Sequence, residues 1–60
     1  MIEEKIFTGK GMLTLDEALE DAKTACVALQ KLDPNYSYKV STEKLVISGE
    51  KLYIGRVYRT

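Results

Sequence analysis

The chain has 60 residues with no histidine, no tryptophan and one cysteine, so a single small domain is expected without the usual residues of acid–base catalysis, metal ligation or disulfide stapling. Its composition, 45% hydrophobic and 30% charged, is typical of a globular rather than a disordered chain. Domains of this size bury only about 60% of their unfolded surface. Because Cys26 has no partner for an intrachain disulfide, self-association is the expected remaining source of stability.

The net charge of zero hides an uneven distribution. Residues 1–30 hold six acidic and three basic side chains, and residues 31–60 hold three acidic and six basic ones. An acidic face and a basic face are one interpretation, and an acidic helix beside basic strands, each simply solvated, is the plainer one. With no apolar run of membrane-spanning length, no signal-peptide pattern and an unpaired cysteine, we expect a cytoplasmic protein that binds no membrane.

Residues 2–8 are predicted to form the first strand, with Ile2 and Ile6 on one face and Phe7 on the other. The following loop, Gly9-Lys10-Gly11, lies between a strand and a helix, as phosphate-binding loops do. Its glycine spacing does not match their fingerprints, and the helix that follows begins with acidic residues. A plain connecting turn is therefore expected.

The clearest element is a helix from Thr14 to Leu32. Thr14 is a good N-cap with Glu17 at the capping-box spacing, and Pro34 ends the helix. The apolar residues of this helix fall on one face: Leu15, Ala18, Leu19, Ala22, Cys26 and Leu29. Ala25, Ala28 and Leu32 widen this apolar face near the C-terminus. Val27 falls on the polar side and is a candidate contact residue.

Three strands are predicted after the helix, at residues 36–41, 44–48 and 51–59. Thr42-Glu43 is the expected break between the first two, and Gly49-Glu50 the expected type II′ turn before the third. The alternative is two long strands with a bulge at Thr42-Glu43. Gly55, inside the last strand, indicates a bulge, a bend or a close approach of another backbone.

These elements predict an α+β fold, with one amphipathic helix on one face of a small, mostly antiparallel three- to four-stranded sheet in β-α-β-β-β order. The sheet's other face would stay open. If Ile6, Leu52 and Ile54 meet the helix, the opposite strand phase faces outward as a contact surface. We therefore expect a homodimer whose interface candidates are Phe7, Val27, Tyr53 and Val57.

The residues do not favour catalysis. Four carboxylates lie on the solvent side of the predicted helix, where a solvated face is the ordinary arrangement: Asp16, Glu17, Glu20 and Asp21. Cys26 lies on the apolar stripe, and the chain has no histidine to activate it, so a buried structural cysteine is expected. We predict no catalytic, cofactor-binding or metal-binding residue.

A nucleic-acid interface on the last strand is the alternative. Its candidates are Lys51, Arg56, Tyr58 and Arg59, since tyrosines flanked by basic residues can stack bases. A regular strand would place Arg56 and Tyr58 on one face and Arg59 on the other. Because that divides the set and the net charge is zero, we expect no nucleic-acid binding at physiological salt.

The sequence thus predicts a non-enzymatic protein-binding or regulatory module that acts as a homo-oligomer with an unknown protein partner. Free-standing chains of this length often come from phages or mobile elements, which suggests the same kind of source here. Nucleic-acid binding through the basic, tyrosine-bearing strands is the second hypothesis, and it would differ in its steep dependence on salt.

Overall fold

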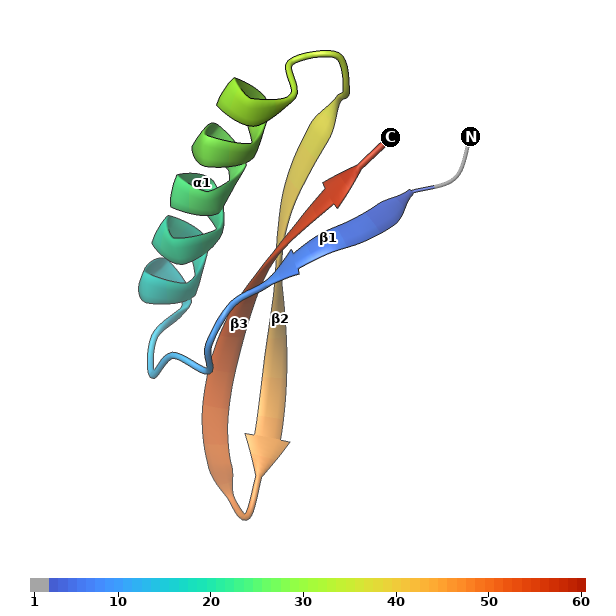
Figure 1. The fold of residues 1–60 in the computed structure, drawn as a ribbon. Helices are drawn as coiled ribbons and strands as arrows, with labels where there is room; N and C mark the ends of the chain where they lie inside the picture. The colour runs from blue at the N-terminus through green and yellow to red at the C-terminus, as the bar shows by residue number, and fades with distance from the viewer. Residues whose placement is uncertain (1–2) are drawn as a thin grey trace.

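A computed structural model describes residues 3–60, which form one helix packed against a three-stranded antiparallel sheet (Figure 1). The elements are β1 (Glu4–Thr8), α1 (Leu15–Leu32), β2 (Tyr38–Ile47) and β3 (Glu50–Arg59). The strand order is β1-β3-β2, so β3 is central. The α+β class is confirmed, and residues 3–60 contain no fourth strand. Ile2, predicted in the first strand, lies outside the described residues.

The last two strands form one long hairpin. Thr42 pairs with Gly55 and Glu43 with Ile54, in a register that is regular from Tyr38 to Ile47. The predicted break at Thr42-Glu43 is therefore wrong, and so is the bulge proposed in its place, although the two-strand alternative is right. An uninterrupted β3 gives both polar residues a cross-strand partner, which outweighs their weak local preference.

The hairpin turn is Ser48-Gly49, one residue earlier than predicted. Both residues have positive φ, 50° and 80°, which is the type I′ conformation and not type II′. Glu50 instead pairs with Ile47 as the first residue of β3. Type I′ turns match the twist of the strands they join, so this turn extends the hairpin without distortion.

Helix α1 begins and ends as the sequence predicts. The Thr14 hydroxyl oxygen accepts from the Glu17 N–H at 3.2 Å and donates to the Glu17 carboxylate at 2.9 Å. The Glu17 side chain thus reaches the cap hydroxyl. At the other end, the Asp33 N–H donates to the Leu29 carbonyl at 2.9 Å, and the Tyr38 hydroxyl donates to the Asp33 carbonyl at 2.7 Å. Tyr38, the first residue of β2, is thereby tied to the C-terminus of α1.

The core lies between α1 and the centre of the sheet. Its fully or nearly buried side chains are Ala18, Ala22, Cys26 and Val57. The small helix residues allow close packing on β3, where a Cβ atom added to Gly55 would collide with the Ala18 carbonyl and the Ala22 methyl. Gly55 pairs with Thr42 in regular register, so close approach is the correct one of its three predicted roles.

The bulge of this fold lies in β1. The β1–β3 register shifts between Lys5 and Phe7, and Ile6 and Phe7 both pack against the core. The prediction that these two side chains point to opposite faces is therefore wrong. A bulge puts two residues opposite one, so it breaks the simple alternation on which the prediction rested.

The molecule is elongated, with extents of 41 × 22 × 12 Å. The hairpin continues well past the N-terminus of α1 (Figure 1). The buried part of the helix's apolar stripe is also shorter than predicted, because the two end residues of α1 are exposed, Leu15 at 48% and Leu32 at 82%. No helix within residues 3–60 is both long enough and apolar enough to span a bilayer.

Candidate interaction surface

The strand register decides which side chains share each face of the sheet. Val57 pairs with Phe7 on one side and Val40 on the other, and all three contribute to the core under α1. Val57 is 0% exposed. The prediction that Phe7, Tyr53 and Val57 face outward is therefore wrong, since their strand phase faces the helix.

Gly55 explains this outcome physically. The helix backbone crosses β3 at Gly55, which has no side chain to keep the helix away. Gly55 and the residues that alternate with it along β3 therefore face the helix. Tyr53 shares that phase and is half-buried. The Tyr53 N–H donates to the Met12 carbonyl at 2.8 Å, and the Met12 N–H donates to the Tyr53 carbonyl at 2.7 Å. These two hydrogen bonds hold the loop before α1 along the edge of β3. The opposite phase, with Leu52 and Ile54, forms the open face of the sheet.

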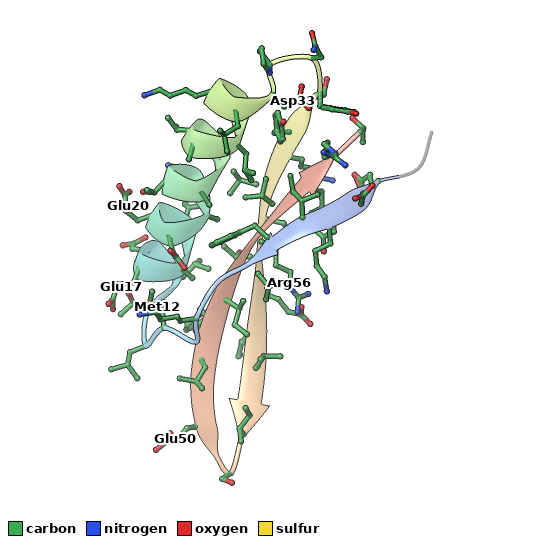
Figure 2. All side chains as sticks on the ribbon, viewed as in Figure 1. Met12, Glu17, Glu20, Asp33, Glu50 and Arg56 are labelled. Carbon is green, nitrogen blue, oxygen red and sulfur yellow. The ribbon has the colours of Figure 1, made fainter. Side chains whose placement is uncertain are left out.

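One end of the open face carries a basic row that crosses all three strands. Tyr58 of β3 pairs with Lys5 of β1 and Lys39 of β2. Arg56 is the next residue of β3 on this face, and Figure 2 shows it on the side of the sheet away from the helix. Lys5 was not among the sequence candidates, because only the long-range β1–β3 register places it beside Tyr58.

Acidic side chains accompany these basic ones. Arg56 forms an ion pair with Glu43, and its side chain is only 23% exposed. The Lys39 ammonium lies 3.7 Å from the Glu3 carboxylate, an exposed and therefore weak pair. The positive charge of Arg56 is thus offset by Glu43, and that of Lys39 by Glu3.

The four nucleic-acid candidates are divided between the faces, as the strand alternation predicts. Arg56 and Tyr58 lie on the open face, and Lys51 and Arg59 belong to the helix-facing phase. The Arg59 guanidinium donates to the Glu4 carboxylate at 3.2 Å and lies 4.3 Å from the centre of the Tyr36 ring. Residues of the two faces cannot contact one strand of nucleic acid together.

The other end of the open face is apolar. We call it the arm patch, defined as the outward side chains of the hairpin beyond the helix: Leu45, Ile47, Leu52 and Ile54. Leu45 and Leu52 are directly paired across the strands, and Ile47 is 55% exposed. On the reverse side Val46 is 63% exposed, since the helix does not reach it. Glu50 marks the tip of this arm in Figure 2.

The remaining sequence candidates have simple environments. Cys26 is buried, as predicted. Val27 is 51% exposed on the helix, and its role in contacts stays a prediction. The Gly9 N–H donates to the Gly55 carbonyl at 2.8 Å, so the glycine loop uses this N–H in the sheet and behaves as the connecting turn we expected.

The pKa of the Tyr38 hydroxyl is raised above its ordinary value. Partial removal from water raises the pKa of its hydroxyl, and the Asp33 carboxylate raises it further, against the lowering effect of Arg59. The hydroxyl donates to the Asp33 carbonyl, which requires the protonated form. This group therefore acts in joining the helix to the sheet.

Within residues 3–60 there is no cavity and no group of three or more side chains arranged to hold a metal ion. Glu17 and Glu20 lie on the side of α1 that faces away from the sheet (Figure 2). Comparisons with protein-family models, curated proteins and solved structures find no match for this chain. The surfaces described above are the basis for assigning a function.

Proposed function

We propose that this chain is a small non-enzymatic protein-binding or regulatory module that acts as a homo-oligomer in the cytoplasm. The arm patch is the observation that carries the proposal. Leu45, Leu52 and Ile54 lie outside the core on a part of the sheet that α1 does not cover. Removing apolar surface from water stabilises by about 25 cal/mol per Å², so a protein surface that covers this patch gains binding energy.

The small core supports the same proposal. Val57 is the one large side chain that is fully buried among residues 3–60. A domain with so little buried apolar volume gains a larger share of its stability from association than a bigger domain does. The proposal includes a cytoplasmic location, because a free cysteine such as Cys26 is typical of a reducing compartment. It also includes a phage or mobile-element source, for the reason of chain length given above.

Two measurements test the proposal. Sedimentation equilibrium at micromolar concentration should give at least twice the 6.8 kDa monomer mass. Immobilised protein should also retain a specific protein from nuclease-treated cell extract, and Leu52→Gln should abolish this retention. Lys51→Gln is the matched control, because it places the same side chain on the neighbouring residue of the opposite phase. A monomeric wild type, or equal retention by both variants, would overturn the proposal.

Nucleic-acid binding is the second candidate, and the row Lys5, Tyr58 and Lys39 is the observation in its favour. An aromatic side chain between two cations can stack a base beside neutralised phosphates. The carboxylates of Glu43 and Glu3 reduce the attraction for a polyanion, so we expect no binding at physiological salt. A fluorescence-anisotropy titration with oligonucleotides checks this, and micromolar affinity that falls steeply with salt and with Tyr58→Ala would reverse the ranking.

A further inference from the structure

The two outer edges of the sheet differ in how well they are protected from pairing with another strand. β1 is five residues long and interrupted by a bulge, which is a common way to block an edge. β2 is ten residues long, regular and without proline, and no described residue pairs with its outer edge. β2 is therefore the edge that is suited to accept a strand.

The hairpin geometry identifies which backbone groups of β2 point outward. In a hairpin closed by a two-residue turn, the residues next to the turn form a hydrogen-bonded pair, and such pairs then alternate along the strands. Ile47 and Glu50 are that first pair. It follows that Val40, Thr42 and Lys44 direct their N–H and carbonyl groups away from β3, toward the free edge.

We propose that the β2 strands of two copies of this chain pair antiparallel about a two-fold axis at Ser41, which makes a continuous six-stranded sheet. This proposal rests on the self-association in the proposed function and specifies its geometry. In this register Lys39 of each copy lies opposite Glu43 of the other on the open face. Both are exposed enough to meet, with side chains 68% and 43% accessible. Pairing would use about eight main-chain hydrogen bonds.

Charge complementarity selects this register from its neighbours. An axis at Glu43 would set the two Glu43 carboxylates directly against each other, which is destabilising. An axis at Thr42 would place Lys39 opposite Leu45 and give no ion pair. Beyond the last pair of β2 residues, the Ser41 axis points Val46 of one copy toward the bend before β2 of the other, which contains Tyr36. These side chains are 63% and 45% exposed in the single chain.

The position of the helix is compatible with this pairing. α1 packs over β3 and β2 and hardly touches β1. If each helix axis lies between β2 and β3, paired β2 strands would set the two helices about 10 Å apart, which is within helix-packing distance. The helices would run antiparallel beside the same two-fold axis.

The helix flank near that axis can be identified. Asp21 faces the β1 side, because a Cβ atom on Gly9 would collide with its carboxylate. Leu19 and Lys23 are about 160° away from Asp21 on the helical wheel, so they overhang β2. Ala22 lies beside Gly55 and packs with Val57, and Arg56 between them pairs with Ser41. Ala22 is therefore near the level of the axis, which brings Leu19 of one copy toward the flank of the other helix that carries Val27. Lys23 of each copy can turn its flexible side chain outward into water.

A proline substitution tests the edge. Thr42→Pro removes an N–H that points to the free edge and not to β3, so the hairpin should fold while the strands of two copies cannot pair. Sedimentation equilibrium should show the dimer weakened at least about 100-fold, because each copy loses a donor and the ring blocks close approach. Thr42→Val is the matched control and should associate like the wild type, with circular dichroism confirming that both variants fold.

A charge exchange tests the register. Lys39→Glu makes the edge acidic and Glu43→Lys makes it basic, so each variant alone should associate at least about 10-fold more weakly, whereas a mixture of the two should form heterodimers. Mass spectrometry of the mixture distinguishes these species. If the wild type dimerises but Thr42→Pro dimerises equally, this geometry is wrong and the proposed self-association stands. If the wild type is monomeric, both are wrong.

Discussion

The half of the sheet under α1 and the arm beyond it are built from the same two strands, yet only the first contains a core. Val57 and Val46 are the same residue type in the same helix-facing phase. Val57 is 0% exposed and Val46 is 63% exposed. The difference comes from the helix, which ends its coverage near Gly55 and leaves the hairpin to continue without it. Strand patterning therefore supplies two apolar faces, and the length of the helix decides how much of one face is buried.

The two halves consequently differ in what a substitution should do. Under the helix, side chains are fixed by the close approach of Ala18 and Ala22 to β3. In the arm, the hairpin is supported by cross-strand pairs and by the backbone bridge between Met12 and Tyr53, with no helix packed on it. A change there should therefore alter contacts with other molecules more than the free energy of unfolding. Substitutions in the two halves can therefore test this division.

Gly55→Val should abolish folding. The new side chain would meet the Ala18 carbonyl, which belongs to the helix backbone and cannot turn aside, and overpacking of this kind costs roughly 3 kcal/mol or more. That is comparable to the whole stability of a domain of this size. Thermal unfolding followed by circular dichroism should show no cooperative transition. Lys51→Val, which adds the same side chain to the arm, should unfold like the wild type, and a folded Gly55→Val protein would contradict the close approach.

Val57→Ala and Val46→Ala compare the two halves with one substitution. Val57→Ala leaves a cavity next to Ala22 and Cys26, so this substitution should lower the free energy of unfolding by about 2 kcal/mol. Val46 is 63% exposed and is not one of the buried core residues, so its truncation should change the free energy of unfolding by less than about 0.5 kcal/mol. Urea denaturation of both variants gives the two values. Equal destabilisation would mean that the arm is packed as tightly as the helix-covered half.

Ser48→Asn should stabilise the hairpin slightly. Ser48 has φ of 50°, and asparagine before glycine is the preferred pair for a type I′ turn. The gain should be about 0.5 kcal/mol, measured as a higher urea midpoint with an unchanged slope. Ser41→Asn, within the regular strand, is the control and should give no gain. A lower midpoint for Ser48→Asn would argue against the type I′ geometry.

The smallest expected effect is a loss of stability at high pH through Tyr38. Its pKa is raised in the folded state above the ordinary tyrosine value of 10.0, so its contribution to stability is complete below that value and declines as the pH rises through the folded-state pKa. Ionisation also removes the proton that is donated to the Asp33 carbonyl. Urea denaturation between pH 8 and 11 should therefore show a steeper decline for the wild type than for Tyr38→Phe. Parallel curves would show that this group does not couple to folding.

The local sequence was sufficient to predict the helix and the strand-rich C-terminal half. Thr14, Glu17 and Pro34 set the helix ends through interactions within a few residues, so no distant contact was needed to find them. The turn was misplaced by one residue, because both Ser48-Gly49 and Gly49-Glu50 contain a glycine that a hairpin turn can use. The hairpin register then corrected it, since Ile47 pairs with Glu50.

The surface was harder to predict, because its composition depends on which strand phase the helix covers. The alternation of β3 determined by itself that Arg56 and Tyr58 share a face and that Val57 shares the other. It could not determine which face is open, since Leu52 and Ile54 are as apolar as Tyr53 and Val57. Only the packing of Ala18 and Ala22 onto Gly55, together with the bulge at Ile6, made that choice. Those contacts join residues far apart in the chain, and a local pattern carries no information about them.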